Sequence, residues 1–95
     1  MVGETGTSTF GLGASRLPKS AVMYHQPVFG SIGYATPSTF GAFQAAMEHK
    51  SLNRGILVTD EESLQLVAMA FADASKLGIK PIVFVLDNNG YTVER

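Results

Sequence analysis

The sequence predicts an α/β fold in which a parallel sheet has helices on both faces, as one partial domain over residues 1–95. Two apolar runs of strand length, residues 55–59 and 81–86, are the first observation. Their apolarity is continuous rather than alternating, which is typical of strands covered on both faces. The second observation is that a helical pattern lies between them. Strands that alternate with helices are joined by right-handed crossovers, and such strands run parallel.

The amino-terminal half is predicted to contain a loop, a short strand and a helix. Residues 1–20 are rich in Gly, Ser and Thr and are predicted to be loop. Residues 21–24 are mostly apolar and predict a buried strand. The pair Thr36-Pro37 predicts a helix start, with a capping hydroxyl followed by proline at the first helical position. Phe40, Phe43 and Met47 follow at helical spacing, so a helix is expected over residues 36–48.

The carboxyl-terminal half contains the clearest helical pattern. Apolar residues recur along one side of residues 61–77, and Gly78 follows as a left-handed terminator. Because ligands bind at the carboxyl ends of parallel strands, the turns there are candidates for a site. The segments expected at that edge are residues 4–8, 29–33, 59–63 and 87–90.

Composition excludes several classes of protein. Of 95 residues, 45% are hydrophobic and 16% are charged, which indicates a packed globular segment. The net charge is −1 without a basic run, so a nucleic-acid partner is not expected. The chain has no cysteine and no apolar run of membrane-spanning length, so neither disulfides nor a membrane partner is expected. A cytoplasmic setting is the default expectation.

Two of these turns carry groups that suit a metal. Residues 87–90, Asp-Asn-Asn-Gly, offer carboxylate, amide and backbone oxygens of the kind that magnesium binds. The alternative is an ordinary surface turn, because Asn and Gly favour such turns. Residues 59–63 hold three consecutive acids that are also candidate ligands. The alternative there is a capping box formed by Thr59 and Glu62 at the start of a helix.

Four segments, taken in order and spacing, resemble one family over essentially the whole chain. They resemble the carboxyl-terminal cofactor-binding domain of the 2-oxo-acid decarboxylases that act on pyruvate, indolepyruvate or branched-chain substrates. The resemblance implies thiamine diphosphate and Mg²⁺ as cofactors. It also implies a carboxy-lyase reaction, the non-oxidative conversion of a 2-oxo acid to an aldehyde and CO₂. The matching segments are Glu4-Thr5-Gly6-Thr7-Ser8, Phe29-Gly30-Ser31-Ile32-Gly33-Tyr34, Ser63-Leu64-Gln65-Leu66 and Asn88-Asn89-Gly90-Tyr91-Thr92-Val93-Glu94-Arg95.

The resemblance assigns contacts with thiamine diphosphate to residues of all four segments. Thr7 and the Gly30 backbone would hold the aminopyrimidine ring. Ile32 would be the apolar wedge that bends the cofactor into a V shape. Ser63 and Thr92 would touch the diphosphate. The full cofactor set is Thr7, Gly30, Ser31, Ile32, Ser63, Thr92 and Val93.

The resemblance also assigns the metal ligands and a catalytic acid. The Asn88 side chain and the Gly90 carbonyl would bind Mg²⁺, and Glu61 falls on the position of the family's aspartate ligand. Glu94 would be the acid that assists decarboxylation and protonation of the intermediate. The cofactor itself would supply the electron sink.

The chain departs from the family at two turns. In the turn after the first apolar run, Asp60-Glu61-Glu62 replaces Gly-Asp-Gly. In the turn after the second run, Asp87 stands at the first position of the family's Asn-Asn pair, and Asn89 stands where an acid is common. Glu61 is one methylene longer than the aspartate, and magnesium demands tight octahedral geometry. Glu62 adds bulk and negative charge beside an anion that should meet bare backbone at a helix N-terminus. These changes predict that cofactor binding is weakened or abolished. The acids are instead expected to cap the helix themselves.

Three functions remain open. The first is a decarboxylase segment that is inactive alone and acts in a homo- or hetero-oligomer with decarboxylase subunits. In the family, another domain from a partner subunit supplies a glutamate and histidines that this chain lacks. The second is a degenerate, non-catalytic module that binds a protein partner. The third is a small α/β domain of unrelated role whose acidic turn is a helix cap.

Overall fold

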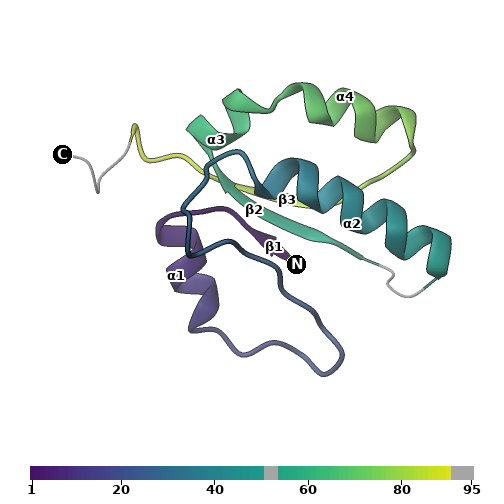
Figure 1. Ribbon diagram of the computed structural model, residues 1–95, viewed down its shortest axis with the longest axis horizontal. Helices are drawn as coiled ribbons and strands as arrows, with labels where there is room; N and C mark the ends of the chain where they lie inside the picture. The colour runs from purple at the N-terminus through teal and green to yellow at the C-terminus, as the bar shows by residue number, and fades with distance from the viewer. Residues whose placement is uncertain (51–53, 91–95) are drawn as a thin grey trace.

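A computed structural model describes residues 1–50 and 54–90 of the chain. Within these residues, three parallel strands form one sheet in the order β1-β2-β3 (Figure 1). The predicted α/β class with a parallel sheet is confirmed. The elements are β1 (Val2–Gly3), α1 (Thr7–Gly13), α2 (Ala35–His49), β2 (Ile56–Asp60), α3 (Glu61–Leu66), α4 (Met69–Lys76) and β3 (Ile82–Leu86).

Helices lie on both sides of the sheet, as the alternation of side chains along β1 shows. Val2 packs with Ala35 of α2 and with Leu57 of β2 on one face. Gly3 faces the other way, because a Cβ built there would lie 3.0 Å from Leu12 of α1. Figure 1 accordingly shows α1 on one side of the sheet and α2 on the other.

The core lies between the sheet and the helices α2 and α4. Leu57 is fully buried in β2, the middle strand of the sheet, and Phe71 and Val83 pack against its cluster. A second cluster joins α2 to α4 through Phe40, whose ring meets that of Phe71 edge to face at a centroid distance of 5.3 Å. Burial of these side chains between layers is what holds the strand ends in place.

The amino-terminal prediction was wrong. Residues 1–20 were expected to be loop, yet they contain β1 and α1. Residues 21–24 were expected to form a strand, but Tyr24 makes only an isolated parallel bridge with Val2 in the described structure. The pairing is tertiary, since Gly3 N donates to Tyr24 O and Glu4 N donates to Val58 O, both at 2.9 Å. Local propensity carries no information about such long-range partners.

The predicted helix at 36–48 is confirmed as α2, although its predicted cap is wrong. The helix begins one residue earlier, at Ala35. Its N-cap residue is Tyr34, whose side chain makes no capping hydrogen bond. Thr36 is instead fully buried, and its hydroxyl has no hydrogen-bond partner in the described structure. A glutamate distant in the sequence takes the capping role, as described below.

The predicted helix at 61–77 is divided in two, and Gly78 follows with the expected positive φ of 69°. The break falls at Val67, whose φ of −126° lies outside the helical range. The nearby Gly33 closely approaches the side chains of Leu66 and Val67, so the break coincides with a tertiary contact.

The strand predicted at 81–86 forms as β3, but the prediction that both its faces are covered is wrong. Four of its side chains, those of Ile82, Phe84, Val85 and Leu86, are 43–54% exposed. The reason is position: β3 lies at the edge of the sheet in the described structure, whereas α1 and α2 pack on β1 and β2. Residues 1–50 and 54–90 contain no helix long and apolar enough to cross a membrane.

Candidate functional site

The predicted turns meet at one edge of the sheet because the three described strands are parallel. The segment after β1 begins with Glu4, the segment after β2 begins with Glu61, and the turn after β3 covers residues 87–90. These three strand ends lie together on the left of Figure 1, away from the amino terminus.

A hydrogen bond joins the turn after β2 to the turn after β3. The backbone N–H of Gly90 donates to Glu61 Oε1 at 3.0 Å, across 29 positions of sequence. The second carboxylate oxygen, Oε2, is buried and has no hydrogen-bond partner among the described residues. Hydrogen bonds from the backbone N–H of Glu61 itself and from that of Gly90 lower the pKa of this carboxyl, while desolvation opposes them. Glu61 is therefore a charged acceptor at neutral pH.

The helix after β2 is capped by Asp60, and the predicted capping role of Thr59 is wrong. Asp60 has extended backbone angles, and its Oδ1 accepts a hydrogen bond from Ser63 N at 2.8 Å. Thr59 is fully buried within β2. The Ser63 hydroxyl is also buried and lacks a hydrogen-bond partner within the described structure.

Glu62 is the third acid of this turn. Desolvation raises the pKa of its carboxyl, and the negative charges of Glu61 and Asp60 raise it further. Repulsion between neighbouring carboxylates at one helix start is the cause of this second, smaller rise of the pKa. The charges of Asp60 and Glu61 therefore already disfavour the ionised form of Glu62.

The loop at 29–33 is held between the end of β1 and the helix α3. The Thr5 hydroxyl donates to Ser31 O at 3.3 Å, and Ser31 N donates to the Gln26 side chain at 3.0 Å. Gly30 has a positive φ of 63° and lies against Thr5, with 3.7 Å between its built Cβ and Thr5 Cγ2. The Ile32 side chain is exposed. The loop thus lies beside Thr5, just after the end of β1.

Glu4 was not singled out from the sequence, although it is the best-buried acid of this edge. Its side chain is fully buried, and its two carboxylate oxygens accept from Thr5 N at 3.0 Å and Ala35 N at 3.1 Å. It therefore links the end of β1 to the start of α2. The only hint in the sequence is an acid directly after a short apolar pair, which is too common to be informative.

The remaining predicted residues are placed only in part. Thr7 is the first residue of α1, and Asn88 is exposed in the turn after β3. Thr92, Val93 and Glu94 lie outside the described residues. Among the described residues, no group of three or more His, Asp or Glu side chains is arranged to hold a metal ion. The three consecutive acids at 60–62 are therefore not a shared ligand set.

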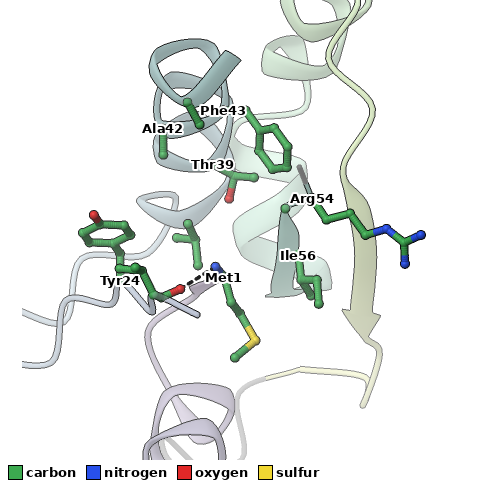
Figure 2. Close-up of a pocket in the computed structure, with 11 residues that line it drawn as sticks. Met1, Tyr24, Thr39, Ala42, Phe43, Arg54 and Ile56 are labelled. Atoms are coloured by element: carbon green, nitrogen blue, oxygen red, sulfur yellow. Dashed lines mark hydrogen bonds between the residues drawn. The ribbon is translucent and has the colours of Figure 1, made fainter. Parts of the chain in front are cut away.

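An apolar pocket lies at the other end of the strands from the candidate site (Figure 2). Side chains of α2 form one wall, and Tyr24, Gly55 and Ile56 form others. Figure 2 shows the Arg54 guanidinium directed away from these apolar groups. The pocket lies at the amino-terminal ends of the strands, so it is separate from the candidate site.

The chain is similar to known proteins along its whole length. No protein-family model matches the chain. Over 95 aligned residues, the chain is 44% identical to a pyruvate decarboxylase of Hanseniaspora uvarum and 42% identical to pyruvate decarboxylase isozyme 3 of Saccharomyces cerevisiae. It is 40% identical to a putative pyruvate decarboxylase of Schizosaccharomyces pombe. The alignments cover 100% of this chain but 17% of each relative. The predicted resemblance is confirmed, and the chain is related along its whole length to one segment of the pyruvate decarboxylases.

Proposed function

We propose that the chain forms the metal- and diphosphate-binding corner of a pyruvate-decarboxylase-like protein. The observation that supports this most is the hydrogen bond from Gly90 N to Glu61 Oε1. It joins the two strand ends at which the resemblance puts Mg²⁺ and the diphosphate of thiamine diphosphate. Bound there, the cofactor would supply the electron sink for decarboxylation of a 2-oxo acid, and the protein would supply position and electrostatic field.

One oxygen of this corner suits Mg²⁺ as a ligand. Glu61 Oε2 is buried without a hydrogen-bond partner in the described structure, so it is an available oxygen ligand. Magnesium prefers oxygen donors of this kind. The Asn88 amide and the Gly90 carbonyl belong to the turn that Glu61 contacts, and they would complete the protein's share of the ligands.

The diphosphate does not fit the corner as these residues stand. Asp60 Oδ1 already accepts from Ser63 N, which is a donor that an anion at this helix start would need. Glu62 adds a carboxyl whose pKa is raised by desolvation and then by the charges of Glu61 and Asp60. A diphosphate would bring further negative charge against all three acids. We therefore expect the chain to bind the cofactor weakly.

Titration calorimetry with thiamine diphosphate and excess Mg²⁺ tests this proposal. The unmodified chain should bind with a Kd weaker than about 1 mM. The combined substitutions Asp60→Gly, Glu61→Asp and Glu62→Gly should restore binding into the micromolar range. Adding Asn88→Ala to that triple variant should remove it again. A folded triple variant that binds no cofactor would show that this corner is not a cofactor site.

The activity of a complete protein is a separate prediction. The chain spans about one sixth of its relatives, as the 17% coverage shows. We therefore propose decarboxylation of a 2-oxo acid, assembly with decarboxylase subunits and a cytoplasmic setting only for a protein of the relatives' length. Glu94, the predicted catalytic acid, would act only in such an assembly.

A second candidate is a non-catalytic module that binds a decarboxylase subunit. The exposed apolar side chains of β3 favour it, because an uncovered edge strand is a common site of pairing. Purified chain mixed with the full-length decarboxylase of Hanseniaspora uvarum should then elute with it in size-exclusion chromatography. Separate elution at micromolar concentrations would count against this candidate.

A further inference from the structure

We infer that two carboxylates of this chain close the corner without any cofactor, and we call this pair, Asp60 and Glu61, the carboxylate latch. The inference rests on the proposed function, since it concerns the same corner. Asp60 occupies the N–H of Ser63 where a diphosphate would bind, and Glu61 ties the turn after β2 to the turn after β3. The latch occupies with protein carboxylates the positions that a bound metal–diphosphate would otherwise take.

The Asp60 arm satisfies a donor that the helix itself leaves free. Ser63 is the third residue of α3, and the first N–H groups of an α-helix have no acceptor within the helix. Asp60 Oδ1 accepts from Ser63 N at 2.8 Å, a short distance typical of a charge-assisted bond. Glycine, which the family has at this position, would leave the same N–H open to a ligand.

The Glu61 arm depends on the length of its side chain. Its Oε1 lies 3.0 Å from Gly90 N. An aspartate would be shorter by roughly 1.5 Å, the length of one C–C bond, which puts its oxygen beyond hydrogen-bonding distance on the same backbone. Gly90 itself has a positive φ of 121°, a conformation that favours glycine. The substitution that lengthens the metal ligand is thus the one that allows the contact.

The latch adds side-chain contacts to two strand ends that the β2–β3 pairing already brings together, since that pairing runs to Asp60 and Leu86. A diphosphate would have to break the bond from Ser63 N and then approach Asp60, Glu61 and Glu62 together. The strand ends, however, need no ligand to stay joined. The latch thus keeps the architecture of the corner while it weakens the binding expected there.

Amide hydrogen exchange, followed by NMR in cofactor-free and Mg²⁺-free buffer, tests the latch. The amides of Ser63 and Gly90 should both be protected in the unmodified chain. Asp60→Ala should accelerate exchange at Ser63 by about tenfold or more and leave Gly90 unchanged. Glu61→Asp should do the reverse. Glu61→Gln keeps the length and one acceptor oxygen, so it should retain most of the protection at Gly90.

The controls are Glu62→Gln in the same turn and Glu48→Ala on the exposed surface of α2, and neither should change either amide. Free exchange of Gly90 or Ser63 in the unmodified chain would overturn the inference, even if a variant fails to fold. Unchanged protection in both Asp60→Ala and Glu61→Asp would also overturn it. These exchange measurements involve no cofactor, so they are independent of the calorimetry. Unprotected amides would reject the latch even if the triple variant binds thiamine diphosphate, and a triple variant that does not bind would reject the cofactor site even if the amides are protected.

Discussion

Replacing Glu4 with alanine should be among the most destabilising single changes in this chain. The side chain is fully buried, and its carboxylate accepts backbone hydrogen bonds from Thr5 and Ala35. Hydrogen bonds to a charged group contribute about 1.5–3 kcal/mol each, and a buried N–H left without an acceptor has a similar cost. Loss of both bonds should therefore lower the free energy of unfolding by about 3–5 kcal/mol. A chain of this size has a total stability of only about 5–14 kcal/mol.

Urea denaturation followed by circular dichroism measures this loss. Glu4→Gln preserves shape and one acceptor oxygen but turns an NH₂ group toward a backbone donor, so about half of the loss is expected. Glu48→Ala is the matched control, because Glu48 is exposed and bonds only to Gln44 among the contacts described for its side chain. It should change stability by less than about 0.5 kcal/mol. A loss below about 1 kcal/mol for Glu4→Ala would refute the structural role assigned to this carboxylate.

Three further changes test the packing of the sheet. Leu57→Ala removes a fully buried side chain from β2, the middle strand, and should lower the free energy of unfolding by about 2–5 kcal/mol in the same urea assay. A loss under about 1 kcal/mol would contradict its burial in the core. Gly55→Ala places a methyl group into the ring of Phe43 and should cost about 1–3 kcal/mol, so an unchanged denaturation midpoint would contradict that contact. Phe84→Lys places a charge on the exposed edge strand, so light scattering should show less self-association. The free energy of unfolding should change by less than about 1 kcal/mol, and a large loss would mean that Phe84 is buried.

The strongly patterned elements were predictable from the residues alone. The apolar runs at 55–59 and 81–86 and the helical pattern at 36–48 appear as β2, β3 and α2 with small shifts at their ends. Each has a periodicity that burial in a layered fold requires. Elements that depend on distant partners were missed. β1 is two residues long and exists because β2 and Tyr24 provide its hydrogen bonds.

The candidate site divides in the same way. The acidic turn after β2 and the Asp-Asn-Asn-Gly turn after β3 were expected at one edge because parallel strands put their carboxyl ends together. The partners of the individual carboxylates were not foreseeable. The sequence left two caps open, Thr59 or the acids that follow it; Thr59 is buried in β2, and the acid Asp60 supplies the cap. One residue of offset in the strand end decides which side chain reaches Ser63 N.

Residue pattern and motif order were enough to establish the α/β class and the relation to pyruvate decarboxylases, because both depend on the order of residues along the chain. The roles of Glu4, Asp60 and Glu61 became clear from coordinates, since a carboxylate at a strand end has several donors within possible reach. Which donor it meets depends on how strands and helices pack, and the bonds from Ala35 and Gly90 cross 31 and 29 positions of sequence. Contacts over such separations follow from the burial of a shared core, and no local pattern encodes them.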